Sequence, residues 1–110
     1  MKTVFERIIA GEIPSEKVFE NEHVFACKDI HPKAPVHLLI ITKKVIPNLQ
    51  SLASADFYLL GEVVLAAQKL AKAFHLEESG YRLLVNNGEN AGQTIFHLHF
   101  HLLGGAPLAE

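Results

Sequence analysis

The sequence predicts an α+β domain with a mainly antiparallel sheet, and three observations support this. Apolar or alternating stretches typical of strands occupy residues 16–20, 23–29 and 36–42, and further ones occupy 80–88 and 95–102. A short helical pattern precedes the first group, and a long helical pattern separates the two groups, an order typical of α+β rather than α/β folds. The 110 residues, 49% apolar and 20% charged, have the composition of one compact globular domain.

The chain is expected to open with a short helix. Thr3 followed by Glu6 is a capping box, which predicts a helix through Ala10 that Gly11 and Pro14 then end. Its apolar residues are expected to face inward: Val4, Phe5, Ile8 and Ile9.

The strand candidates 16–20 and 23–29 are separated by a polar dipeptide, which predicts a hairpin. Cys27 shares a side with Phe25 in the second strand and is predicted to be a buried small hydrophobe. Residues 29–35 are predicted to form a loop because two prolines in four residues do not fit a central strand. The strongly apolar stretch 36–42 follows as a strand that contains His37.

The long helix is predicted from about Ala55 to His75, with Ser54 as its candidate cap. One face of it is apolar, comprising Leu60, Val63, Val64, Ala67, Leu70, Ala71 and Phe74. Leu59 and Leu65 flank this stripe and widen it beyond one core contact, which predicts a second packing partner such as another copy of the chain. Ordinary scattered surface leucines are the alternative interpretation.

Charge and cysteine content exclude several classes of protein. A net charge of −2, with no basic cluster beyond Lys43-Lys44, argues against nucleic acid as a partner. Charged residues within the first twelve positions exclude a secretory signal, and no apolar run is long enough to cross a bilayer, so no membrane partner is expected. The single Cys27 cannot form an internal disulfide, and a cytoplasmic location is expected.

Three histidines stand at every second position of the last strand candidate: His97, His99 and His101. Alternation places them on one face, neighbours roughly 6.5 to 7 Å apart at a rise of about 3.3 Å per residue. Ile95 shares this face, and the other face is expected to pack inward through Phe96, Leu98, Phe100 and Leu102.

Three interpretations of this strand are open. The first is an amphipathic strand whose outer face is rich in histidine. The second is a metal site, with His37 as a further ligand and Asp29 as a carboxylate partner, although neighbouring histidines would have to converge sharply on one ion.

The third interpretation is an anion site with a histidine nucleophile. A neutral imidazole can attack phosphorus while neighbouring rings stabilise charge on the phosphoryl oxygens. The preceding loop is rich in glycine and amide side chains, and Asn86, Gln93 and Thr94 can hydrogen-bond to ribose or phosphate.

The stretch HLHFHLL resembles the signature of the histidine-triad (HIT) nucleotide-binding proteins, His-φ-His-φ-His-φ-φ with φ apolar. VFERIIAGEIP is typical of the family's opening, DIHPKAPVHLLII resembles its Asp-Ile-x-Pro-x-Ala-Pro-x-His segment, and GYRLLVNNGENAGQTIFHLHFHLLGG is similar to its C-terminal half. Residues 1–110 are thus identified as a single HIT domain, for which the family implies a five-stranded meander sheet. The loop AGQT and the Gly-Gly after the strand resemble the Hint branch, whereas uridylyltransferase relatives carry glutamine in place of His101.

The resemblance implies a role for each matching position. His99 matches the nucleophile that takes the AMP group, and His101 matches the residue that contacts the phosphate. His97 matches the member whose carbonyl orients the nucleophile, and His37 matches the fourth histidine beside the triad. Ribose, phosphate and leaving-group positions are matched by Asn86, Gly92, Gln93 and Thr94. The base and ribose pocket is matched by Phe5, Ile8, Ile13, Phe25, Asp29 and Ile30.

The function implied is that of a homodimeric hydrolase of purine nucleotide conjugates, AMP or GMP phosphoramidates above all, that needs no metal or other cofactor. Dinucleoside polyphosphate hydrolysis on the same scaffold, a non-catalytic nucleotide sensor and a metal-dependent hydrolase are the alternatives. Two positions depart from the family pattern: Ala91 replaces a common glycine and His31 a common serine.

Overall fold

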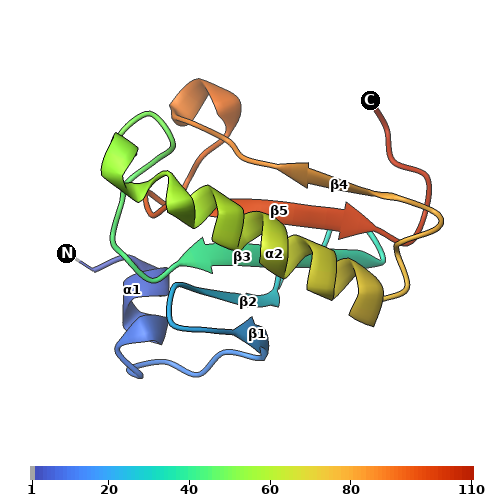
Figure 1. The fold of residues 1–110 in the computed structure, drawn as a ribbon, viewed down its shortest axis with the longest axis horizontal. Coiled ribbons are helices and arrows are strands. Elements are labelled where there is room, and N and C mark those ends of the chain that lie inside the picture. Colours follow the sequence, from blue (N-terminus) through green and yellow to red (C-terminus); the bar gives the residue numbers. More distant parts are fainter. Residues whose placement is uncertain (1) are drawn as a thin grey trace.

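The computed structural model describes residues 2–110, in which a long helix crosses one face of a five-stranded sheet (Figure 1). The chain runs in the order α1 (Val4–Ile9), β1 (Lys17–Glu20), β2 (Val24–Lys28), β3 (Val36–Thr42), α2 (Tyr58–Ala73), β4 (Tyr81–Leu84) and β5 (His99–Gly104). Two 3₁₀ turns, Ser54–Asp56 and Glu89–Ala91, precede α2 and β5. This architecture confirms the predicted α+β class.

Every pair of neighbouring strands is antiparallel, but the strand order β1-β2-β3-β5-β4 is only partly a meander. The first three strands follow the expected up-and-down order. After β3 the chain crosses the sheet along α2, forms β4 at the far edge, and returns through β5 between β3 and β4 (Figure 1). The more apolar strand β5 takes the inner position because it has buried residues to pack, whereas β4 is largely exposed.

The two faces of the sheet pack against different clusters of buried residues, because side chains alternate between the faces along each strand. The face under α2 holds the larger core, which includes Val24, Ala26, Leu38, Ile40, Phe100 and Leu102. The opposite face holds a smaller cluster of Phe5, Phe25, Cys27 and Ile41, which lies beside α1. The predicted burial of Cys27 is confirmed. Histidines that alternate with Phe100 and Leu102 must therefore face the α1 side.

The predicted capping box opens α1. The Glu6 amide donates to Thr3 Oγ1 at 3.1 Å, and the Thr3 amide donates to Glu6 Oε1 at 3.2 Å. The prediction that all four apolar residues face inward is wrong for Val4 and Ile9, which are exposed. A helix of six residues has less than two turns, so only Phe5 is buried beneath it.

Helix α2 begins at Tyr58, later than predicted, because residues 54–56 form a 3₁₀ turn. Ser54 is not its cap: the serine side chain makes no capping bond, and its carbonyl accepts from the Phe57 amide at 3.2 Å. Leu59 belongs to the core rather than to a flank, and Val64 is exposed rather than inward. No helix within residues 2–110 is both long and apolar enough to cross a membrane.

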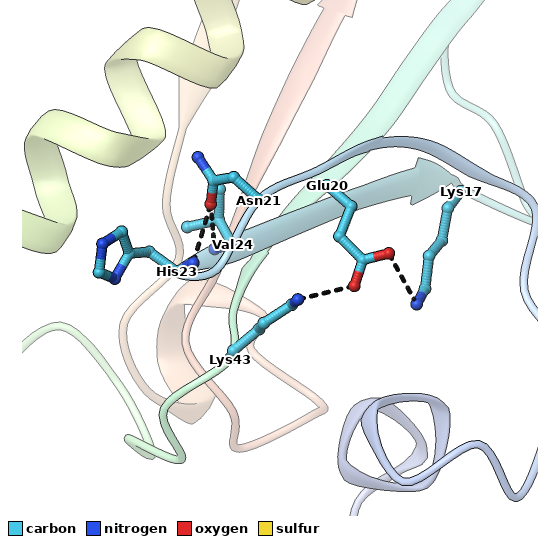
Figure 2. Close-up of polar contacts among 6 residues, drawn as sticks. All are labelled: Lys17, Glu20, Asn21, His23, Val24 and Lys43. Carbon is cyan, nitrogen blue, oxygen red and sulfur yellow. Dashed lines mark hydrogen bonds and ion pairs between the residues drawn. The ribbon is translucent and has the colours of Figure 1, made fainter.

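The turn between β1 and β2 is held by side chains, as Figure 2 shows. Asn21 Oδ1 accepts from the amides of His23 and Val24 at 2.8 and 2.9 Å, which closes the predicted hairpin. Glu20 lies between two cations, with its Oε1 3.2 Å from Lys17 Nζ and its Oε2 2.7 Å from Lys43 Nζ. The last contact links this edge hairpin to the end of β3.

Candidate active site

Strands β3 and β5 bring three histidines together on the face opposite α2. In the antiparallel register His101 lies opposite Leu39 and His99 opposite Ile41, so His37 is the diagonal neighbour of His101 on the same face. The ring centroids of His99 and His101 lie 5.3 Å apart, and those of His37 and His101 lie 5.2 Å apart. His37 and His101 are thus in direct contact, although they lie 64 residues apart in the sequence.

His97 lies just before β5, which begins at His99, so the regular strand is shorter than predicted. Its ring is fully buried, and its Nε2 donates to the Thr42 carbonyl at 2.6 Å. The His97 carbonyl in turn accepts from His99 Nδ1 at 2.7 Å. A carbonyl can only accept, so the His99 proton is assigned to Nδ1 and its Nε2 carries a free lone pair.

A second hydrogen-bonded chain assigns the tautomers of His37 and His101. The Lys33 amide donates to His37 Nδ1 at 3.0 Å, which places the proton of a neutral His37 ring on Nε2. This Nε2 lies 2.9 Å from His101 Nδ1 and 3.4 Å from Asp29 Oδ2. His101 Nδ1 is then the acceptor, and its own proton lies on Nε2.

Burial lowers the pKa of all three rings, because the charged form loses its hydration. Desolvation lowers the pKa of His99 below its ordinary value, although the bond to the His97 carbonyl opposes this. Desolvation, with repulsion from His99 and His37, lowers the pKa of His101 to about 4. Desolvation also lowers the pKa of His37, against the attraction of Asp29. At neutral pH the cluster is therefore uncharged, with a lone pair on His99 and a donor on His101.

A cavity of about 670 Å³ opens beside these rings, between the α1 segment and the sheet. Eight of the residues singled out in the sequence line it: Phe5, Ile8, Ile13, Asp29, Ile30, Thr94, His99 and His101. Its inner wall is apolar, and Phe5 packs edge-on against His99 at 5.0 Å between ring centroids. The polar groups of the lining include Asp29, Thr94 and the two histidines. The volume and this division suit a ligand with one flat apolar part and one anionic part.

Other residues singled out in the sequence lie outside the cavity lining: Phe25, His37, Asn86, Gly92, Gln93 and His97. Phe25 is buried in the smaller cluster beneath Phe5, and His37 lies behind His101. Gln93 is 5% exposed, and its amide is hydrogen-bonded to other parts of the chain. Phe25, His37, Gln93 and His97 are thus buried and do not form the cavity surface, whereas Asn86 is partly exposed and Gly92 is exposed.

Several lining residues were not predicted to belong to the site, among them Val4, Ser15, Glu16, Cys27, Lys28, His31, Leu39 and Ile95. Alternation is the signal that could have found Cys27, because it shares a face with Asp29 two positions later. Burial raises the pKa of the Cys27 thiol, so it forms part of the apolar wall. Glu16 and Lys28 form an ion pair of 3.2 Å at the rim.

Asp29, His37 and His101 each offer a donor atom, and these atoms lie within 4.8 Å of one another. The lone pair of a neutral His37 is already used by the Lys33 amide. Binding a metal ion through Nε2 would move the ring proton to Nδ1 and break that bond. The hydrogen bond at His37 Nδ1 thus runs opposite to the usual one, because the nitrogen of a metal-bound histidine that does not bind the metal normally donates.

Comparisons with known proteins point to one family. A family model described as the HIT domain matches residues 10–108. An uncharacterized HIT-like protein of Chlamydia trachomatis is 53% identical over 110 residues, which cover 100% of this chain and 98% of that protein. The purine nucleoside phosphoramidase of Escherichia coli K12 is 41% identical over 107 residues, 97% of this chain and 90% of the enzyme.

Solved structures show the same likeness. The HIT family hydrolase of Legionella pneumophila superposes with a TM-score of 0.95 at 44% identity, covering 98% of this chain and 96% of that one. The histidine triad nucleotide-binding protein of Candida albicans superposes with a TM-score of 0.83 at 35% identity, covering 99% and 85%. Family model, relatives and fold all agree, and the chain belongs to the HIT-domain family.

Proposed function

We propose that this protein hydrolyses purine nucleotide conjugates, most of all AMP or GMP phosphoramidates, through a covalent nucleotidyl-histidine at His99. One observation carries the proposal: the His97 carbonyl holds His99 Nδ1 at 2.7 Å, so the unprotonated Nε2 belongs to a neutral ring that lines the cavity. The phosphoramidase name of the Escherichia coli relative supports the choice of substrate.

The remaining lining residues suit the parts of a nucleotide. The base packs against the apolar wall formed by Phe5, Ile8 and Ile13. Asp29 Oδ1 is engaged by the His31 amide at 2.8 Å, which leaves Oδ2 to accept a ribose hydroxyl. The α-phosphate then lies beside His99 and His101, where Thr94 offers a hydroxyl.

Two displacements follow from this arrangement. His99 Nε2 attacks the α-phosphorus, a bond forms between them, and the bond from phosphorus to the leaving amine breaks. His101 Nε2–H donates a hydrogen bond to the phosphoryl oxygens, and the departing amine takes a proton from solvent, which is returned when water adds in the second step. Water then attacks the same phosphorus, the bond to His99 breaks, and AMP is released. Splitting one difficult displacement into two easier ones is the advantage of a covalent intermediate.

We also propose that the protein is a homodimer. Four large apolar residues are exposed on α2 or directly before it: Phe57, Tyr58, Val64 and Leu65. Gly61 lies among them with open space around it, which lets a second helix approach closely. The outer edge of β4 also lacks a neighbouring strand within residues 2–110. Sedimentation equilibrium tests this: twice the mass of the chain supports the dimer, and a monomer at micromolar concentration contradicts it.

Trapping the intermediate tests the reaction. Incubation with an adenosine phosphoramidate labelled at phosphorus, followed by a quench in base, is expected to leave label on His99. A phosphohistidine-type bond survives base, whereas it is lost in acid, and peptide mass spectrometry locates the label. Turnover without any trapped label under single-turnover conditions would contradict the covalent step.

The same assay separates the alternatives. Faster cleavage of diadenosine tetraphosphate than of the phosphoramidate would favour a dinucleoside polyphosphate hydrolase. Tight AMP binding without release of product from any conjugate would favour a nucleotide sensor. Activity that disappears on exhaustive chelation and returns with a divalent ion would favour the metal-dependent alternative.

The pH dependence follows from the lowered histidine pKa values. Attack needs the neutral form of His99, and its pKa lies below the ordinary 6.5. We therefore expect kcat/KM to fall toward acid with a midpoint below pH 6.5, since kcat/KM reports the free enzyme. Measurements between pH 4.5 and 8 check this. A midpoint at or above 6.5 would mean that the ring is not desolvated as described.

A further inference from the structure

Gln93 is the most thoroughly hydrogen-bonded side chain near the cavity, and it touches the cavity only through its neighbours. Its Nε2 donates to the carbonyls of Pro47 and Ile95 at 2.9 and 3.1 Å. Its Oε1 accepts from the Gly88 amide at 2.8 Å. Both donors and one acceptor of the amide are thus used, in a side chain that is 5% exposed.

These bonds hold the backbone at Gly88, Pro47 and Ile95 against the Gln93 side chain. The Gly88 bond closes the 3₁₀ turn of residues 88–92, and the Gln93 amide returns a bond of 3.1 Å to the Gly88 carbonyl. The Pro47 bond ties this turn to the loop that follows β3. Gly88 and Gly92 have φ of +88° and +91°, a conformation that side chains resist, so the turn is tight.

The Ile95 bond matters most for the site. The Gln93 side chain bonds to the carbonyl of Ile95, two positions later. This bond spans Thr94 and restrains the backbone on both sides of it. Thr94 and Ile95 line the cavity together with His99 and His101. Within residues 2–110 the Thr94 amide has no acceptor, so it is available to a ligand.

We propose that Gln93 is a positioning residue, which sets the Thr94–Ile95 wall against a phosphate held at His99. This inference rests on the proposed function. The sequence pattern predicted that Gln93 itself contacts ribose or phosphate, whereas the structure directs its amide away from the cavity. Neither side chain of similar length replaces it: glutamate lacks the two donors, and methionine has no donor and only a weak acceptor.

The test compares Gln93→Met, which keeps length and volume, with the same change at Gln50, an exposed residue of the loop after β3. We expect Gln93→Met to lower kcat about 10- to 100-fold while the Kd for AMP changes less than about 5-fold, since displacing a positioning group by about 1 Å has effects of this size. Gln50→Met is expected to retain the kcat of the wild type. A folded Gln93→Met with unchanged kcat would overturn the proposal.

A double-mutant cycle asks whether Gln93 acts through Thr94. In a Thr94→Ala background, Gln93→Met is expected to lower kcat less than about 3-fold, because the contribution of Thr94 that Gln93 supports is already lost. An equal loss in both backgrounds would overturn this route. If Gln93→Met does not fold, Gln93→Glu replaces it, since it keeps the shape and the Gly88 bond while losing both donors.

One readout does not depend on turnover. Amide hydrogen exchange by NMR is expected to accelerate at Gly88 in Gln93→Met, and the AMP-induced shift of the Thr94 amide resonance is expected to shrink. If the wild type releases no AMP, the proposed function fails while these two measurements still report on the positioning. Unchanged exchange at Gly88 and an unchanged Thr94 shift would overturn the positioning role by themselves.

Discussion

The variant His99→Asn is expected to lose at least about 1,000-fold in kcat on an adenosine phosphoramidate, a loss in the range that removal of a nucleophile causes in other enzymes. Asparagine keeps a polar group near the His97 carbonyl but has no ring nitrogen that can bond to phosphorus. Steady-state release of AMP measures the effect. Binding of AMP is expected to change much less than kcat, because the base and ribose contacts of the cavity remain.

His75→Asn is the matched control for this change. His75 is exposed at the end of α2, far along the chain from the cavity lining, and its φ of +60° is one that asparagine tolerates. It is expected to retain the activity and the melting temperature of the wild type. If His99→Asn also retained full activity, the nucleotidyl-histidine mechanism would be abandoned.

The second large effect concerns stability and the opposite face of the same strand. Phe100 lies between His99 and His101, is 7% exposed, and packs in the core under α2. Phe100→Ala is expected to lower the free energy of unfolding by about 3–5 kcal/mol through lost burial and the cavity left behind. Urea unfolding followed by circular dichroism measures it.

Phe96→Ala provides the comparison, since it makes the same change four positions earlier. The sequence pattern predicted that Phe96 packs inward like Phe100, but this is wrong, because Phe96 is 47% exposed. Phe96→Ala is expected to lower the free energy of unfolding by less than about 1 kcal/mol, as other surface substitutions do. Equal losses for the two variants would show that the two faces are not divided as described.

The sequence contained most of the fold because its local signals agree with one another. A strongly apolar stretch identified β3 with its bounds, the capping box identified α1, and the apolar stripe identified α2 apart from its first turn. Errors arose where a pattern continues past the end of an element. Phe96 and His97 carry the period of a strand, yet the regular strand begins only at His99 because the preceding loop is tied to Ile46 and Thr42.

The candidate site divides in the same way. Spacing alone was enough to place His99 and His101 on one face, since a period of two is a property of any strand. The tertiary structure decided which nitrogen each ring presents, because that depends on the His97 carbonyl, the Lys33 amide and the contact between His37 and His101.

What the sequence by itself determined is the line of histidines, the apolar surface behind them and the family to which they point. What only the tertiary structure decided is the cavity and the direction of each polar group. Gln93 shows the difference: its composition suits a ligand contact, but its partners Pro47 and Gly88 come from separate segments of the chain. Long-range partners of this kind have no local pattern, because the hydrogen bonds form only after the sheet has brought the segments together.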